Sequence, residues 1–310
     1  MSEAAPKELS ETKAGSVKGT MFPAEVISDL FNKVAGHSTL AKISGQVPTA
    51  MSGSDIFTFQ MDAEANIVAE SGAKAAGGIT VAPVHMTPIK IEYGARVTDE
   101  FMYASEEKQL DILSAFTEGW AKKLARALDI MAMHGVNPRD KAVSALIGTN
   151  SLDTNTGVTG ITYVSGSEEN NLEDAIAAIG DYDNTGYAFS KGFAATLGKL
   201  KVNGVPQYPE FKLGGNPSAL NGTACDVNST VGFVDTQTSK NFAYVGDFAN
   251  AFKYGIAKDI PLEVIPYGNP DNDANAGDLK GHNQVYLRAE AYLGWGILDG
   301  GAFARIQTRP

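Results

Sequence analysis

The chain has 310 residues, and its 36 acidic and 25 basic side chains give a formal net charge of −11. Because 43% of its residues are hydrophobic, a chain of this length can bury a substantial core, which excludes a largely disordered protein. The acidic balance argues against a protein that grips nucleic acid, since phosphate neutralisation needs clustered Lys and Arg. The single cysteine, Cys225, excludes an internal disulfide and a thiolate metal site.

The sequence contains no membrane-spanning or secretory signal. No window approaches the roughly 18 consecutive apolar residues that a spanning helix needs, and the N-terminus lacks the charged-then-apolar pattern of a signal peptide. We therefore expect a soluble product made in the cytoplasm, without a membrane partner.

The N-terminal residues 1 to about 20 are polar and charge-mixed, which predicts an extended arm. Pro23 then precedes a segment with helical spacing of apolar residues, so a short amphipathic helix is expected within residues 22–43. The apolar positions are Val26, Ile27, Leu30, Phe31 and Val34.

Apolar and polar residues alternate at residues 56–59 and again at 89–93, on either side of a Gly/Ala-rich segment at 70–78. This pattern predicts a long β-hairpin whose tip is too small and polar to pack by itself. A long hairpin with no covering helix leaves sheet edges open, and open edges recruit other chains. We therefore expect the hairpin to lie on a neighbouring molecule.

A long amphipathic helix is predicted from Ser105, as N-cap, to a stop near Gly135. At 1.5 Å per residue it would be roughly 40 Å long. Trp120 is expected to lie under an adjacent sheet. The apolar positions that define the buried face are Leu110, Leu113, Phe116, Trp120, Leu124, Leu128 and Met131.

Residues 140–260 have a mixed α/β pattern. Helices are predicted at 171–179 and 191–201, the second ending at Asn203-Gly204, and strands at 230–234 and 242–245. Alternation returns at 261–266 and 283–297, around a polar loop at 268–278 that has no apolar periodicity. Without an internal repeat or a clear linker, these parts are expected to be subdomains of one folded unit.

The sequence offers few candidates for chemistry. The loop at 271–277 resembles the start of a calcium loop, but its glycine is one place late and the twelfth position has no Glu. Phosphate-loop, nucleophile-elbow and zinc-helix motifs are absent. His37, His85, His134 and His282 are isolated, and Cys225 has no basic neighbour in the sequence to activate it. We therefore predict no catalytic residue, cofactor or metal, and a protein that is not an enzyme.

The C-terminal quarter carries three segments in a recognisable order: VGDFANAFKYGI at 245–256, PLEVIP at 261–266 and NQVYLRAEAYLGWGILDGGAFARI at 283–306. With them, the chain resembles the major capsid proteins of tailed bacteriophages with the Hong Kong 97-type fold. The resemblance implies an α+β fold with an N-arm (1–45), an E-loop hairpin with its flanks (46–104), a P-domain spine helix (105–139), an A-domain (140–260) and return strands of the P-domain (261–310).

The same resemblance implies a function in assembly. The chain would form hexamers and pentamers of an icosahedral shell that encloses double-stranded DNA, and it would be found in the virion. Because the spine helix begins near residue 105, no room is left for a long scaffolding segment, which implies a separate scaffolding protein, or none. The expected partners are other copies of the chain, a separate scaffolding protein and a portal. The alternatives are an encapsulin-type cellular compartment, which would carry a cargo-binding N-terminal helix, and a soluble α/β enzyme, which would leave the hairpin unexplained.

Some capsids of this fold join their subunits by an isopeptide bond between an E-loop lysine and a P-domain asparagine, promoted by a glutamate. By resemblance, the candidates are Lys74, Asn283 and Glu290, with the Asn-to-Glu spacing of seven residues found in crosslinking members. The alternative is structural: Asn283 begins a strand, Glu290 pairs with a nearby cation and Lys74 keeps the tip soluble. The sequence leaves both interpretations open.

Overall fold

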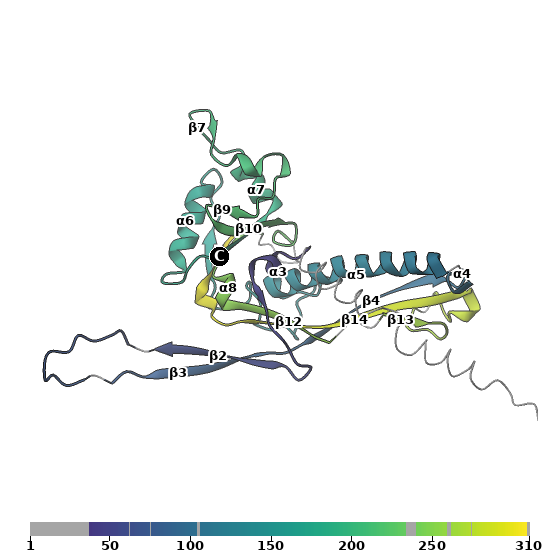
Figure 1. The fold of residues 1–310 in the computed structure, drawn as a ribbon. Helices are drawn as coiled ribbons and strands as arrows, with labels where there is room; N and C mark the ends of the chain where they lie inside the picture. Colours follow the sequence, from purple (N-terminus) through teal and green to yellow (C-terminus); the bar gives the residue numbers. More distant parts are fainter. Residues whose placement is uncertain are drawn as a thin grey trace, which may run out of the picture. The chain divides into compact units, whose positions relative to one another are not determined.

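A computed structural model describes most of the chain after residue 36 (Figure 1). The described residues are 37–61, 63–74, 76–103, 106–233, 240–258, 262–273 and 275–308. The predicted arm, residues 22–36 of the helix predicted at 22–43 and the N-cap Ser105 lie outside them. The fold mixes helices and strands, as the α+β prediction requires. None of the described helices is long and apolar enough to cross a membrane.

The chain divides into two compact units. The first unit contains residues 90–125 and 258–292 among the described residues, and the second contains 38–89, 126–257 and 293–308. Helix α5 and strand β14 contribute residues to both units. Each unit has a hydrophobic core of its own, and the six-stranded sheet lies in the second unit.

Helix α5 spans Glu106–His134 and confirms the predicted long helix. Its apolar spacing buries Trp120, Leu124 and Leu128 almost completely. The helix ends where Gly135 adopts a φ of +69°, a left-handed conformation that glycine tolerates best. The short helix α4, Glu100–Tyr103, precedes it.

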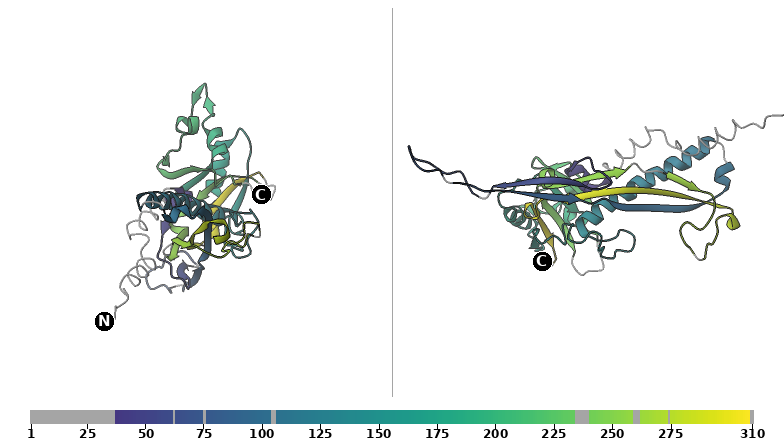
Figure 2. Two further views of the ribbon diagram at one scale, coloured as in Figure 1. Left: turned by 90° about the vertical axis from the view of Figure 1, so that its right-hand side faces the viewer. Right: turned by 90° about the horizontal axis from the view of Figure 1, so that it is seen from below.

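In the first unit, α5 covers a sheet made of β4 (Ile89–Thr98), β13 (Leu262–Ile265) and the first part of β14 (Gln284–Ile297). Strand β14 pairs with β13 antiparallel and also with β4. Its side chains alternate between buried and half-buried up to Tyr292, as the alternating sequence predicts. The buried face meets α5, which runs along these strands in Figure 2. Trp120 packs there with Ala289 and Ala291, so the predicted position of Trp120 is confirmed.

The polar loop between β13 and β14 is organised by one arginine of β4. The guanidinium of Arg96 donates to both carboxylate oxygens of Asp271, at 2.8 and 2.6 Å, and to Asn269 Oδ1 at 2.8 Å. It also donates to the backbone carbonyls of Ala276 and Gly277. These oxygens are the type that would coordinate a calcium ion. The guanidinium occupies their centre, so the loop is held by a side-chain cation of the chain.

We expect Arg96→Ala to expose this loop to proteases. The Arg96 hydrogen bond lowers the pKa of Asp271 to about 2 from its ordinary value of 3.8. The pair's contribution to stability is therefore present above pH 3.8 and lost as the pH falls through about 2. Limited proteolysis at pH 7 and pH 4 should show a protected loop in the wild type at both values, and cleavage within residues 266–283 in the variant.

Two further variants sharpen this test. Arg96→Lys should fail to restore protection, because an ammonium group lacks the planar fork that holds a carboxylate and several carbonyls at once. Arg126→Ala is the matched control, since the hydrogen bond shown for that side chain goes to the Ser229 hydroxyl rather than to the loop. Equal protection of the loop in Arg96→Ala and Arg126→Ala would contradict the prediction.

The second unit contains a six-stranded sheet in the order β5-β15-β11-β6-β10-β9. Strands β6 and β10 are parallel, as are β15 and β5, whereas β11 is antiparallel to both β15 and β6. The strands are β5 (Thr159–Thr162), β6 (Gly186–Ser190), β9 (Ala219–Leu220), β10 (Thr223–Asn228), β11 (Asn241–Gly246) and β15 (Phe303–Gln307).

Helices α6 (Glu168–Ala178) and α7 (Lys191–Leu197) pack on this sheet through a shared core. The core is rich in aromatic side chains. The ring centroid of Phe189 lies less than 6 Å from the ring centroids of both Phe193 and Phe211. The remaining small elements of this region are β7 (Lys201–Val202), β8 (Val205–Pro206) and the 3-10 helix η1 (Pro209–Gly214).

Several predicted elements of this region differ in the structure. The helix predicted to 201 ends at Leu197, and Asn203-Gly204 forms the turn between β7 and β8, because both residues take the positive φ of a tight hairpin turn. The predicted strand at 230–234 is also wrong over its described residues, which form a turn at Thr230–Gly232. Strand β11 and helix α6 confirm the predictions at 242–245 and 171–179 to within three residues.

The predicted hairpin forms, but with a different second strand. Strand β2 (Ser54–Met61) pairs antiparallel with β3 (Ile79–Met86), whereas the alternating residues 89–93 belong to β4 and pair with β14. Pro83 explains the error, because a proline within a run argues against a strand in sequence reasoning. A two-stranded sheet tolerates a proline because each strand has one open edge, where the missing backbone N–H needs no partner strand.

The remaining elements complete the second unit. Helix α3 (Thr39–Ile43) leads into β1 (Gly45–Gln46), which pairs in parallel with β12 (Phe252–Lys258). Strand β12 lies next to β14 in the same sheet. Three short helices stand between strands: α8 (Phe248–Ala251), η2 (Lys280–His282, in the first unit) and η3 (Gly300–Ala302).

Candidate functional site

The β2–β3 hairpin carries large apolar side chains that remain exposed. The exposed fractions of Phe57, Phe59 and Met61 are 59%, 75% and 77%. Residues directly opposite one another in an antiparallel pair share one face of the sheet. One face of the hairpin is therefore a continuous apolar stripe, which we call the hairpin face. It consists of the pairs Phe57–Pro83, Phe59–Val81 and Met61–Ile79.

The base of the hairpin is firmly packed. Met86 is fully buried, and a Cβ on Gly296 would lie 3.0 Å from its Cγ, so glycine at 296 permits the close approach. At the same end, His85 Nδ1 lies 2.5 Å from a carboxylate oxygen of Asp55. The hairpin is thus fixed at its base while its face stays exposed, an arrangement typical of a segment that contacts another molecule.

The structure places Lys74 in the loop between β2 and β3, exposed to solvent. Asn283 lies between η2 and β14 with a left-handed φ of 52°, and its carbonyl accepts the backbone N–H of Asp99 at 2.9 Å. Asn283 and Glu290 are seven residues apart along an extended segment, roughly 20 Å at the rise of a β-strand. The two residues are therefore not brought together within one chain.

Glu290 lies on the half-buried face of β14 in a cluster of charges. Its carboxylate is 2.8 Å from Nζ of Lys90 and 3.4 Å from Nε of Arg288. The hydrogen bond to Glu290 raises the pKa of Lys90. Arg288 also pairs with Glu263 at 2.6 Å. In a single chain, Glu290 is thus already engaged by two cations of its own sheet, and the crosslink remains a prediction.

A buried carboxylate holds the N-terminus of α3. Asp129 of α5 is fully buried and accepts four hydrogen bonds. The donors are the Ser38 hydroxyl (2.5 Å), the backbone N–H groups of Thr39 (3.0 Å) and Leu40 (3.2 Å), and the Thr230 hydroxyl (2.8 Å). Burial raises the pKa of Asp129, and these four donors act against that increase. The carboxylate therefore caps the N-terminus of α3 from another helix.

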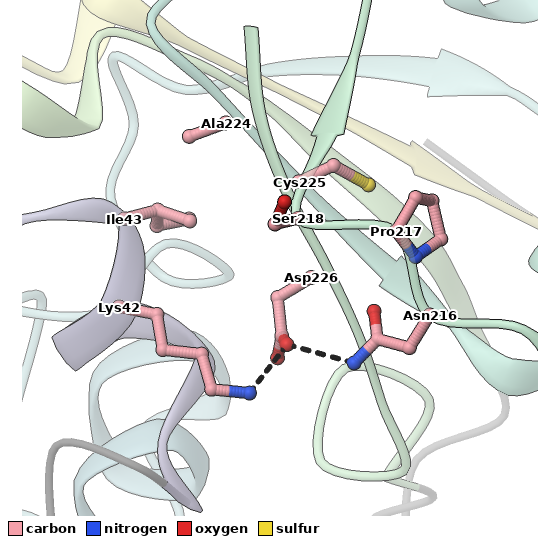
Figure 3. A pocket seen from close by; sticks show the side chains of 8 residues that line it. All are labelled: Lys42, Ile43, Asn216, Pro217, Ser218, Ala224, Cys225 and Asp226. Atoms are coloured by element: carbon pink, nitrogen blue, oxygen red, sulfur yellow. Dashed lines mark hydrogen bonds and ion pairs between the residues drawn. The ribbon is translucent and has the colours of Figure 1, made fainter.

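A second buried acid holds the same helix from the sheet. Asp226 of β10 accepts from the Thr39 hydroxyl at 2.6 Å, Lys42 Nζ at 2.6 Å and Asn216 Nδ2 at 3.0 Å. Figure 3 shows Lys42 and Asn216 pointing at this carboxylate from opposite sides. The three residues line a cavity of about 310 Å3. Because these polar groups satisfy one another, the cavity offers no unpaired charge to a ligand. Its lining comprises Lys42, Ile43, Asn216, Pro217, Ser218, Ala224, Cys225 and Asp226.

Sequence reasoning missed both acids, although one signal was present. Asp129 is the single charged residue in the otherwise apolar run from Ala127 to Met133, and an acid within a buried helix segment needs donors. Nothing in the sequence identified those donors, because residues 38–40 lie about 90 positions away. Asp226 gave no such signal, since it lies in a polar segment.

The end of α5 carries a second buried polar cluster. His134 Nδ1 lies 2.8 Å from Asp153 Oδ2, and Nε2 lies 2.8 Å from the carbonyl of Thr230. Asp153 also accepts from Asn241 Nδ2 at 2.7 Å and from the Tyr244 hydroxyl at 2.8 Å. These contacts join α5 to β11 and give His134 structural partners. Among the described residues, no group of three or more acidic, His or Cys side chains is placed to hold a metal ion.

Comparison with known proteins identifies the family. The model of the phage capsid family matches residues 18–308, which is nearly the whole chain. The chain belongs to the phage capsid family. It is therefore a structural protein of a capsid shell, and the predicted resemblance is confirmed. The exposed hairpin is now a feature of a capsid protein.

Solved structures show the same fold. A structure from Mycobacterium phage Ogopogo has a TM-score of 0.73 and 29% identity, and the match covers 87% of this chain and 92% of that chain. A structure from Gordonia phage Cozz has a TM-score of 0.70 and 23% identity, over 87% of this chain and 86% of that one. The capsid of a native GTA particle, computed with C5 symmetry, has a TM-score of 0.59 and 14% identity, over 88% and 90%.

These likenesses establish the Hong Kong 97-like fold of this capsid protein. No curated protein matches the chain. The family match favours a virion protein over the soluble enzyme that the sequence left as an alternative.

We expect the thiol of this capsid protein to be unreactive in the folded state. Cys225 is buried in β10, and burial raises its pKa to about 12 from 9.0. Since the thiolate is the reacting species, a rise of about three pKa units lowers its population roughly 1,000-fold. Iodoacetamide labelling followed by mass spectrometry should modify Cys225 in urea but leave it unmodified for hours in buffer. Rapid labelling in buffer would contradict this burial.

Proposed function

We propose that the chain is a major capsid protein whose copies assemble into hexamers and pentamers of an icosahedral shell around double-stranded DNA. The hairpin face is the observation that carries this proposal. Phe57, Phe59 and Met61 are more than half exposed on a two-stranded sheet with open edges. A monomer would leave this face in water, whereas a neighbouring copy buries it.

The contact between the hairpin face and a neighbour is a heterologous one, because the hairpin of one copy lies on a different surface of the next. Heterologous contacts close into rings when the rotation between copies allows it. Rings of five and six copies then tile a closed shell. A separate scaffolding protein and a portal belong to the same proposal as further partners.

The net charge of −11 fits a wall that encloses DNA without binding it tightly. Phosphate groups repel an acidic surface, and sequence-specific recognition would need clustered basic side chains. We therefore propose that the shell holds DNA by confinement rather than by base contacts.

Sedimentation and electron microscopy of the purified protein test the proposal, with its scaffolding protein co-expressed. We expect particles in the megadalton range, with rings of five and six copies in the images. A stable monomer under every condition would refute the proposal. Closed shells that contain a protein cargo and no DNA when purified from their natural source would support the encapsulin-type alternative instead.

A denaturing gel of boiled mature particles distinguishes the two interpretations of Lys74, Asn283 and Glu290. A ladder of covalent multimers that disappears in Glu290→Ala would establish the isopeptide crosslink between copies, in which Nζ of Lys74 bonds to Cγ of Asn283 and the Asn283 amide nitrogen leaves as ammonia. Because Glu290 is paired with Lys90 in the single chain, assembly would have to displace that lysine first. A clean band near 32.7 kDa would show that the three residues are structural and that the hairpin contact is non-covalent.

A further inference from the structure

His134 is the last residue of α5, and its imidazole is buried, with 4% of the residue exposed. A neutral imidazole carries a proton on one ring nitrogen and accepts a hydrogen bond at the other, whereas an imidazolium donates from both. The groups opposite the two nitrogens therefore decide the charge of the ring. Its place at the C-terminus of a helix also favours a positive charge.

Both ring nitrogens face oxygen acceptors. Nε2 lies 2.8 Å from the backbone carbonyl of Thr230, and a carbonyl only accepts, so this contact requires a proton on Nε2. Nδ1 lies 2.8 Å from Oδ2 of Asp153. An ionised carboxylate also only accepts. The second contact therefore requires a proton on Nδ1 as long as Asp153 is ionised.

The surroundings of Asp153 favour its ionised form. Its Oδ1 accepts from the hydroxyl of Tyr244 at 2.8 Å, and its Oδ2 accepts from Nδ2 of Asn241 at 2.7 Å. Nη1 of Arg305 lies 3.5 Å from Oδ1. Hydrogen-bond donors and a nearby positive charge both favour a carboxylate over the protonated acid.

A neutral ring is the alternative, and the geometry opposes it. Nδ1 lies 3.3 Å from Nδ2 of Asn241, which could donate to an unprotonated nitrogen. That amide is closer to Oδ2 of Asp153, and an unprotonated Nδ1 would set its lone pair against the same carboxylate at 2.8 Å. The hydroxyl of Tyr244 lies 3.4 Å from Nδ1 but donates to Asp153. An imidazolium avoids this repulsion.

Two other cations belong to the surroundings of the ring. Nη1 of Arg305 donates to the backbone carbonyls of Leu152 and Asp153 in addition to its ion pair. Nζ of Lys141 lies 5.2 Å from the centroid of the Phe233 ring, which is 6.0 Å from the imidazole. Lys141 is exposed, so water screens its charge. The charge of Arg305 is distributed over several acceptors, and the close contact with Asp153 therefore decides the charge of the imidazole.

Thr230 joins this ring to the anchor of α3. Its carbonyl accepts from His134, and its hydroxyl donates to Asp129 at 2.8 Å. Asp129 in turn accepts from the Ser38 hydroxyl and from the first backbone N–H groups of α3. Thr230 is fully buried, so its carbonyl has no water to turn to if Nε2 stops donating.

We propose that His134 is a buried imidazolium and that its two hydrogen bonds, to Asp153 and to Thr230, form a pH-sensitive clamp between the end of α5 and the anchor of α3. When the ring loses one proton, the other stays with the carboxylate of Asp153, the stronger acceptor. Nε2 then turns a lone pair toward the carbonyl of Thr230, and that contact is lost. The inference concerns the single subunit and does not depend on the proposed assembly.

Nitrogen NMR tests the charge of the ring directly. The chain with His37→Gln, His85→Gln and His282→Gln keeps His134 as its single histidine, and the three replaced side chains are exposed. With 15N-labelled histidine, we expect both ring nitrogens to have the chemical shift of a protonated nitrogen at pH 7.5, above the ordinary histidine pKa of about 6.5. One unprotonated nitrogen at pH 7.5 would overturn the inference.

Asp153→Asn tests the cause of the charge in the same single-histidine chain. It removes the negative charge beside Nδ1 and keeps the shape of the side chain, so we expect one ring nitrogen to be unprotonated at pH 7.5. Asp299→Asn is the matched control, because that carboxylate also accepts from a tyrosine hydroxyl, Tyr182, and is not among the partners of His134. Two protonated nitrogens in Asp153→Asn would contradict the proposed clamp.

The pH dependence of stability gives an independent test. The folded ring holds a proton that an unfolded histidine releases near pH 6.5, so the contribution of His134 is fully present below about pH 6.5 and declines as the pH rises. While the folded ring keeps the proton, the folding equilibrium constant should fall about tenfold per pH unit relative to His134→Gln. Urea unfolding of both chains between pH 6 and pH 9 measures this ratio, and a constant ratio would overturn the inference. The NMR measurement decides the question where His134→Gln does not fold.

Limited proteolysis shows whether the charge of the ring reaches α3. In the single-histidine chain we expect slow cleavage within residues 38–43 at pH 6 and faster cleavage at pH 9, with the unfolded chain as the reference for protease activity. Thr230→Val lacks the hydroxyl that donates to Asp129, so its cleavage should be fast at both pH values. Equal protection of α3 at pH 6 and pH 9 in the single-histidine chain would show that the proposed clamp does not hold α3.

Discussion

Phe59→Asp is expected to abolish shell assembly while leaving the isolated subunit folded. Phe59 is 75% exposed at the centre of the hairpin face, so its replacement should change the free energy of unfolding by no more than about 0.5 kcal/mol. In the shell the same side chain would be buried against a neighbour, where a phenylalanine contributes roughly 1.5–3 kcal/mol. A buried, unpaired carboxylate costs more than that contribution. Since every copy would make the proposed contact, we expect the losses to accumulate over the particle.

Thr80→Asp is the matched control. Thr80 lies in β3 next to Val81, it is exposed, and the alternation of a strand places it on the opposite face of the hairpin. It therefore adds the same charge at the same distance from the base. Urea unfolding followed by circular dichroism measures subunit stability, and sedimentation velocity measures assembly. If Phe59→Asp and Thr80→Asp assemble equally well, the hairpin face is not the contact surface.

The elements that the sequence predicted well are those whose signal is local and repeated. Helix α5 shows its apolar spacing over 29 residues and ends at a glycine with positive φ. Strand β14 alternates over most of its length because α5 covers one face. In both elements the apolar residues follow one period along the whole segment, so a single residue that departs from the period does not change the predicted structure.

The elements that it missed depend on pairing between distant segments. Strand β3 contains Pro83 within the non-polar run Val81–Val84, so its local pattern is weaker than the alternation at the start of β4. Strand β10 has a polar sequence, and Asp226 is buried there only because Thr39, Lys42 and Asn216 supply donors. Pairing of this kind is decided by tertiary context, which no local pattern records.

The β2–β3 hairpin was likewise predictable in part. The hairpin was predicted as a contact segment from its alternation and its lack of a cover, and the capsid family was recognised from the C-terminal segments. The face proposed to make the contact could not be predicted, because it depends on the register of Phe57, Phe59 and Met61 with β3. A shift of one residue would have exchanged the two faces.

Asp129→Ala is expected to destabilise the subunit by about 3–5 kcal/mol. The substitution removes one acceptor and leaves four buried donors without a partner, two of them the first N–H groups of α3. No water is expected to replace the carboxylate fully, because a small cavity gives a single water fewer acceptor sites than two carboxylate oxygens. Urea unfolding measures the loss, and limited proteolysis should show new cleavage near residues 38–43.

Thr39→Val distinguishes the cap that Asp129 provides for α3 from the contact between Thr39 and Asp226. It removes the hydroxyl that donates to Asp226 but keeps the backbone N–H that donates to Asp129. We therefore expect a loss of only about 1–2 kcal/mol, the contribution of one hydrogen bond to a charged acceptor. If Thr39→Val is as damaging as Asp129→Ala, the Asp226 contact and not the cap holds α3 in place. If Asp129→Ala costs less than Thr39→Val, α3 is held by its apolar contacts, and the buried carboxylate is not its anchor.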